Sequence, residues 1–128
     1  ITFDPKIAKR IYSGIDIFLM PSRYEPCGLG PMFALRFGTI PIVRETGGLV
    51  DLIQKFDPRT GKGNGFIFSG YKPEDFLEAM RRAVDIYRDE KLWVKLMKNG
   101  MACDFSWAQS ARQYAAVYER TERKSLQV

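Results

Sequence analysis

Short apolar runs separated by helical patterns are the feature that most constrains the fold of this chain. Runs of mostly β-forming residues occur at 15–20, 39–44 and 66–68. The first run, IDIFLM, does not alternate apolar with polar residues, which is typical of a strand covered on both faces. Helical patterns lie before, between and after the runs, and such alternation implies a parallel sheet with right-handed crossovers. We therefore predict an α/β fold, a Rossmann-like parallel sheet with flanking helices.

Several start and stop signals delimit the predicted helices. Asp4 suits an N-cap, and Ser106 begins a capping-box pattern. Gly38 and the pair Asn99–Gly100 are expected to end helices. Pro41 argues against a central place in the sheet for the second strand, although proline is tolerated near a strand start. We expect helices at 4–14, 29–38, 72–90, 90–99 and from 106 on, with a short one after the glycine pair 47–48.

The length of 128 residues is enough for one domain with a modest core. Three strands are nevertheless few, because open α/β sheets usually carry five or six. The chain also begins without an initiator methionine. We therefore expect 1–128 to be the second half of a nucleotide-binding domain from a longer protein.

Composition excludes several functional classes. The net charge is +5, but the 20 basic residues are scattered among 15 acidic ones, which favours a solvated surface or an anionic-ligand site over nucleic-acid binding. The chain has no histidine and two separated cysteines, which excludes a Ser-His-Asp or Cys-His mechanism within it and leaves zinc without its usual ligands. No apolar run approaches the roughly 20 residues that cross a bilayer. Without a visible signal peptide, we expect a cytoplasmic protein, or a plastid one if the source is a plant.

Two unusual loops follow the first and second predicted strands, PSRYEPCGLG at 21–30 and RETGGL at 44–49. Ligands of open α/β sheets bind at the carboxyl ends of the strands, so both loops belong at that edge. Each loop combines glycines with a helix start, where free N–H groups and the positive end of the helix dipole suit phosphate. Two such turns side by side could hold a diphosphate by backbone alone.

Glu25 is the unexpected residue of the first loop, three positions before Gly28. A carboxylate is a poor neighbour for phosphate but a good acceptor for paired sugar hydroxyls. Glu25 beside a phosphate cradle therefore suits a sugar joined to a diphosphate. Spacing alone leaves two other hypotheses open. Glu25 could compensate the helix dipole, worth about 0.3–1 kcal/mol, in a generic phosphate-binding domain, and the glycine pair could simply mark a turn in a domain without a ligand.

The segment PSRYEPCGLGPMFALRFGTIPIVRETGGLVDLI at 21–53 resembles the signature region of bacterial glycogen synthases and plant starch synthases. The combination of SRYEPCGL with TGGL at the next strand-to-helix junction is highly specific. Similarity continues upstream in IAKRIYSGIDIFLMPS and downstream in GNGFIFSGYKPEDFLEAMRRAV and SWAQSARQYAAVYE. The resemblance therefore covers nearly all of the chain.

This resemblance implies a retaining glycosyltransferase of the two-domain GT-B architecture. The range 1–128 would be the distal part of its C-terminal, nucleotide-sugar-binding domain. Such enzymes transfer glucose from ADP-glucose, or UDP-glucose in some, to the non-reducing end of an α-1,4-glucan with retention. The expected partners are that donor and, through the missing domain, the glucan acceptor. We expect no cofactor, metal ion, nucleic acid or membrane.

By motif position, Glu25 matches the family acid that binds the donor glucose hydroxyls, and we assign it to the catalytic site as an orienting group rather than a base. Seven further positions match donor-binding residues: one that stacks on adenine, three in the first turn and three in the second diphosphate loop. In that order they are Phe3, Cys27, Gly28, Leu29, Thr46, Gly47 and Gly48. Phe3 could equally be a hydrophobic staple before the first helix. Cys27 is better explained as a small residue filling the turn than as a nucleophile, since no base is evident.

The chain departs from the family pattern in several ways. Phe33 stands where related transferases carry a second Glu, although glycogen and starch synthases often lack that acid. Pro31 stands where the family commonly has Gln, which puts one polar contact in doubt. Arg44 could reach phosphate or form a surface pair. The family's Arg–Lys pair, which neutralises the leaving diphosphate, and its acceptor domain lie upstream of these residues. Because such cations are usually a large catalytic term, we expect this chain alone to have no synthase activity.

Rival hypotheses remain. One is another GT-B glucosyltransferase, of the sucrose or trehalose type, although EPCGL and Phe33 favour glucan synthesis. The other is a non-catalytic nucleotide-sugar-binding or interaction module that kept the fold.

Overall fold

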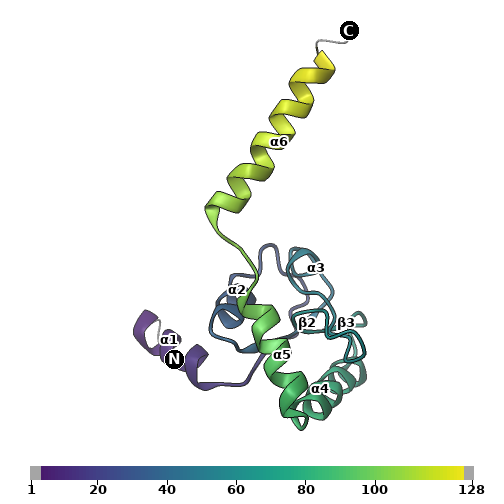
Figure 1. The fold of residues 1–128 in the computed structure, drawn as a ribbon. Coiled ribbons are helices and arrows are strands. Elements are labelled where there is room, and N and C mark those ends of the chain that lie inside the picture. Colours follow the sequence, from purple (N-terminus) through teal and green to yellow (C-terminus); the bar gives the residue numbers. More distant parts are fainter. Residues whose placement is uncertain (1–3, 126–128) are drawn as a thin grey trace.

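A three-stranded parallel sheet lies at the centre of the computed structural model, which describes residues 4–125 (Figure 1). Its strands are β1 (Ile17–Met20), β2 (Ile40–Arg44) and β3 (Phe66–Phe68), in the spatial order β1-β2-β3. Ile17 pairs with Ile40, and Ile42 pairs with Phe66. All three strands lie within the predicted apolar runs, which confirms the α/β parallel-sheet prediction.

Six helices connect and flank the strands in the described part of the chain. The first begins as predicted, because the Asp4 side chain accepts hydrogen bonds from the N–H groups of Lys6 and Ile7 at 2.8 and 3.2 Å. Gly38 follows the second helix with a φ of 80° and ends it, as expected. The helices are α1 (Pro5–Gly14), α2 (Leu29–Arg36), α3 (Leu49–Leu52), α4 (Pro73–Tyr87), α5 (Glu90–Met101) and α6 (Trp107–Ser125).

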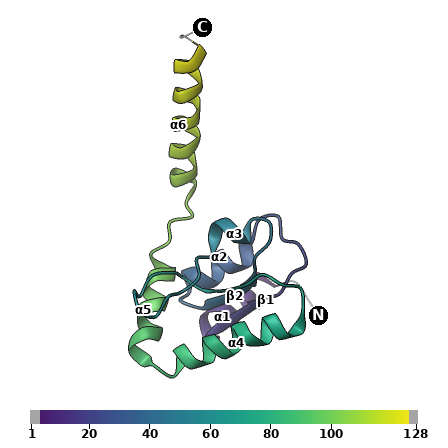
Figure 2. The same ribbon diagram turned by 90° about the vertical axis from the view of Figure 1, so that its right-hand side faces the viewer.

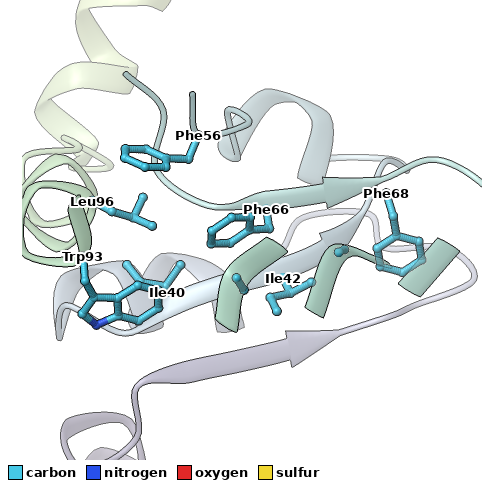
Figure 3. Packing of buried hydrophobic residues seen from close by; sticks show 9 residues of the cluster. Ile40, Ile42, Phe56, Phe66, Phe68, Trp93 and Leu96 are labelled. Carbon is cyan, nitrogen blue, oxygen red and sulfur yellow. The ribbon is translucent and has the colours of Figure 1, made fainter. Parts of the chain in front are cut away.

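Helices cover both faces of the sheet, with α2 and α3 on one side and α4 on the other (Figure 2). The side chains of β2 alternate between these faces. Ile40 and Ile42 pack in a cluster with α4 and α5 that includes Trp93 and Leu96 (Figure 3). Val43 packs in a second cluster with residues of α2 and α3. The lack of polar alternation in β2 thus reflects burial on both sides. In β1 no residue is fully buried and Leu19 is 47% exposed, so the expectation that the first strand is covered on both faces is wrong.

Pro41 lies in β2, the central strand of the sheet. The inference that this proline disfavours a central position is therefore wrong. The N–H of Ile40 donates to the carbonyl of Asp16, on the β1 side. Because successive N–H groups of a strand point to opposite sides, the nitrogen of Pro41 faces β3. Pairing with β3 begins only at Ile42. The proline therefore takes a place where no ladder hydrogen bond is lost.

Gly100 does not end α5, contrary to the expectation from the Asn99–Gly100 pair, because the helix continues to Met101. Gly100 is buried, and a Cβ at this position would lie 2.7 Å from Cδ2 of Leu35 in α2. The glycine therefore serves the close approach of two helices rather than termination.

Thr39 links the end of α1 to the start of β2 through hydrogen bonds of its hydroxyl group. It is buried, and its hydroxyl lies 2.7 Å from the carbonyl oxygen of Tyr12 and 2.9 Å from that of Ile15. Thr39→Val keeps the shape and removes the donor, so we expect the free energy of unfolding to fall by about 1–2 kcal/mol. Urea denaturation checks this value. The exposed Thr60→Val is the control, expected within about 0.5 kcal/mol, and an equal effect of both variants would contradict the prediction.

The last helix, α6, extends away from the body of the structure in both views (Figures 1 and 2). Trp107 at its start is 89% exposed, and Tyr114 and Tyr118 are also exposed. Within residues 4–125, no helix has the length and apolar character needed to span a membrane.

Candidate functional site

The loops that follow β1 and β2 meet at the carboxyl edge of the sheet, as predicted. The N–H of Gly48 donates to the carbonyl of Glu25 at 2.9 Å. A Cβ at Gly47 would overlap that same carbonyl oxygen, and one at Gly48 would lie 2.7 Å from the carbonyl oxygen of Pro26. Gly47 also has a φ of 49°, which favours glycine. The glycine pair therefore allows backbone-to-backbone contact between the two loops.

The Glu25 side chain turns back onto its own loop. Its Oε1 accepts hydrogen bonds from the N–H groups of Gly28 at 3.1 Å and Cys27 at 3.4 Å. The resemblance assigns Glu25, Cys27 and Gly28 to one donor site. The structure places the carboxylate of Glu25 within hydrogen-bond distance of the N–H groups of the other two residues. In this arrangement, the half-buried carboxylate occupies the N–H groups of Cys27 and Gly28, and their contact with a phosphate stays a prediction.

Gly28 is the N-cap of α2 and has a φ of 88°, in the left-handed region. A Cβ there would lie 2.8 Å from side-chain carbons of both Leu49 and Leu52. The next residue, Leu29, begins the helix and exposes its side chain. The first loop therefore directs the start of an eight-residue helix, with its positive dipole end, toward the Glu25 side of the sheet edge.

The second loop uses much of its backbone internally. The carbonyl of Thr46 accepts from the N–H of Leu49 at 3.1 Å, and that of Gly47 accepts from Val50 at 3.4 Å. The N–H of Gly48 is bound to the first loop, as described above. Thr46, Gly47 and Gly48 are thus brought beside Glu25, and their contact with a diphosphate stays a prediction. Phe3 lies outside the described residues.

A groove of about 750 Å³ lies beside Cys27 and was not anticipated from the sequence. One wall comes from α2, including Met32, and the other from the segment that joins α5 to α6. Hydrogen bonds from Ser106 hold the pKa of Asp104, on that second wall, below its usual value. A sequence signal for this groove is the aromatic pair Phe105 and Trp107, of which only Trp107 falls in the helix expected from 106 on. The lining residues are Cys27, Leu29, Met32, Phe33, Arg36, Gly100, Cys103, Asp104, Phe105, Ser106, Trp107 and Ser110.

The two cysteines are free thiols, Cys27 exposed and Cys103 half-buried. The thiol of Cys103 lies 3.3 Å from Nδ2 of Asn64 and 3.4 Å from the carbonyl oxygen of Asn99. In the part of the chain that the structure describes, no group of three His, Cys, Asp or Glu residues could hold a metal ion. The expectation of metal-free transfer stays a prediction.

Comparison with protein families assigns the chain to a family. The model of the family described as glycosyl transferases group 1 matches residues 3–102, which include both loops. The chain belongs to this family. The resemblance drawn from SRYEPCGL and TGGL is thereby confirmed at the level of the family.

Individual members of the glycosyl transferases group 1 family are more closely similar. The chain is 56% identical over 119 residues to a glycogen synthase of Kosmotoga olearia, covering 93% of this chain and 25% of that protein. It is 52% identical over 124 residues to a glycogen synthase of Fervidobacterium nodosum, covering 97% and 26%. The chain therefore spans about a quarter of the length of the curated relatives it matches.

A solved structure matches the fold. The catalytic domain of starch synthase IV from Arabidopsis thaliana, bound to ADP and acarbose, superposes with a TM-score of 0.84 at 41% identity. The match covers 94% of this chain and 25% of that one. The fold is thus that of part of a GT-B glycosyltransferase, as the sequence analysis predicted.

Proposed function

We propose that residues 1–128 are the distal part of the donor-binding domain of a glucosyltransferase. Its donor is ADP-glucose or UDP-glucose, and its product is an α-1,4-glucan extended at the non-reducing end with retention. The observation that carries this proposal is the contact between the Glu25 loop and the Gly47–Gly48 loop at the carboxyl edge of the sheet. The glycogen synthase relatives and the starch synthase bound to ADP and acarbose support the donor and acceptor classes.

Each group has a role in the proposed reaction. The pyrophosphate binds at the start of α2, where the N–H groups of Cys27, Gly28 and Leu29 and the helix dipole compensate its charge. Displaced from the Gly28 N–H, the Glu25 carboxylate accepts hydrogen bonds from glucose hydroxyls and orients the ring. With no protein nucleophile assigned, the acceptor hydroxyl attacks C1 of glucose from the face that the diphosphate leaves. The C1–O bond to the diphosphate breaks as the glycosidic bond forms, and the hydroxyl proton passes to the leaving diphosphate.

A chimeric enzyme tests the proposal. The matching segment of the Kosmotoga olearia glycogen synthase, 56% identical to this chain, is replaced by residues of this chain. We expect the chimera to extend glycogen from ADP-glucose or UDP-glucose, and this chain alone to show no extension. A folded chimera that binds neither donor would overturn the proposed function. Extension by the isolated chain would contradict the view that it supplies only part of the site.

A further inference from the structure

Arg44, the last residue of β2, joins this strand to the loop that carries Glu25. Its Nε donates to the carbonyl of Ser22 at 2.9 Å, and its Nη2 donates to the carbonyl of Arg23. The planar guanidinium thus spans two successive carbonyls, a geometry that the single ammonium group of lysine cannot reproduce. From the sequence, Arg44 could bind phosphate or form a surface pair, but the structure shows its guanidinium bound to backbone carbonyls.

The guanidinium also lies over an aromatic ring. Its Cζ lies 5.3 Å from the ring centroid of Tyr71, within the range of a cation–π contact. Tyr71 belongs to the loop after β3. The neighbouring Glu45 strengthens the same junction, because its N–H donates to the carbonyl of Phe68 at 2.9 Å and its carboxylate accepts from the hydroxyl of Ser69.

The Glu25 loop is therefore fixed at two points by the end of β2 and the loop that follows. Arg44 binds it at Ser22 and Arg23, just before Glu25, and the N–H of Gly48 binds the carbonyl of Glu25 itself. Residues 23–25 are thus held by hydrogen bonds at both ends of this short stretch. The direction of the Glu25 side chain thus depends on Arg44, although the guanidinium is occupied by carbonyls rather than directed at a ligand.

We propose that Arg44 is a positioning residue for the donor site, which holds the Glu25 loop so that the carboxylate meets the hexose. This inference rests on the proposed function. If Arg44 acts through Glu25, its loss should weaken binding of the sugar nucleotide more than binding of the nucleotide without the sugar. A direct phosphate ligand would instead affect both ligands equally.

The variants Arg44→Gln and Arg44→Lys test the assignment, with Arg82→Gln as a matched control. Arg82 is also half-buried and donates from Nη2 to a backbone carbonyl, that of Ile67 at 2.8 Å, but it lies on α4. Amide hydrogen exchange of the 128-residue chain is measured at residues 23–28. Loss of charge-assisted hydrogen bonds is expected to speed exchange about tenfold in Arg44→Gln and less in Arg44→Lys. Arg82→Gln should leave exchange there unchanged.

The same variants in the chimeric enzyme give the functional readout. We expect Arg44→Gln to lower the preference for ADP-glucose over ADP by about tenfold, with partial recovery in Arg44→Lys. Equal weakening of both ligands without faster exchange at 23–28 would overturn the inference in favour of a phosphate ligand. Faster exchange with unchanged preference would also overturn it. Failure of the unsubstituted chimera to bind either donor would instead refute the proposed function, while the exchange data would still decide whether Arg44 holds the loop.

Discussion

Glu25→Gln in the chimeric enzyme is expected to lower kcat/KM for the sugar-nucleotide donor by at least about 100-fold. Hydrogen bonds to a charged group contribute roughly 1.5–3 kcal/mol each, and every 1.4 kcal/mol is tenfold. The amide retains an oxygen that can accept from the N–H of Gly28, as Oε1 of Glu25 does at 3.1 Å. The loss therefore falls on the sugar contacts rather than on the loop. Steady-state kinetics with varied donor concentration measures it.

Measurement of ADP binding distinguishes a Glu25 that contacts the sugar from a Glu25 that only stabilises the start of α2. ADP carries no hexose, and in the proposed binding mode its phosphates displace the Glu25 carboxylate from the N–H groups of Cys27 and Gly28. We expect Glu25→Gln to bind ADP as tightly as the parent or more tightly. Glu74→Gln, which changes an exposed acid in the first turn of α4, is the control for helix-dipole effects. If both variants had the same small effect on kcat/KM, Glu25 would serve only the helix start.

Much of the fold could be predicted because burial on both faces leaves a direct trace in the central strand, β2. Runs such as 39–44 are apolar without alternation, and one face packs on α4 and α5 while the other packs on α2 and α3. Pro41 and Gly100 were misjudged for a shared reason. Proline usually marks an edge strand, but the nitrogen of Pro41 faces β3 at a point where no hydrogen bond between the strands is made. Glycine often ends a helix, but Gly100 is needed because Leu35 packs directly against it. Such facts depend on neighbours distant in sequence.

The proximity of the two loops was predictable, but the contacts between them were not. Parallel strand order places the loops after β1 and β2 at one edge, so the proximity of Glu25 to the Gly47–Gly48 pair followed from topology. No sequence pattern indicated that the N–H of Gly48 binds Glu25 rather than facing solvent, or that Arg44 binds carbonyls. Hydrogen-bond partners are selected by ångström-scale backbone positions. Propensity and motif spacing do not determine those positions.

Gly47→Ala is expected to lower the free energy of unfolding of this chain by at least about 2 kcal/mol. A left-handed conformation costs a non-glycine residue roughly 1–2 kcal/mol, and Gly47 has a φ of 49°. The added Cβ would also overlap the carbonyl oxygen of Glu25, a backbone atom that cannot rotate away. Relief requires the two loops to separate, which breaks the hydrogen bond from the N–H of Gly48 to that carbonyl. Urea denaturation followed by circular dichroism measures the loss.

Gly14→Ala is the matched control, because a Cβ at this last position of α1 meets nothing within 4 Å. Its effect should be small or stabilising, since alanine is favoured over glycine in helices by up to about 1 kcal/mol. Because separation of the loops also moves Glu25, the chimera carrying Gly47→Ala should lose donor preference along with stability. Native stability in Gly47→Ala would show that the loops do not pack backbone to backbone. The proposed donor site, which rests on contact between these two loops, would then have to be placed elsewhere.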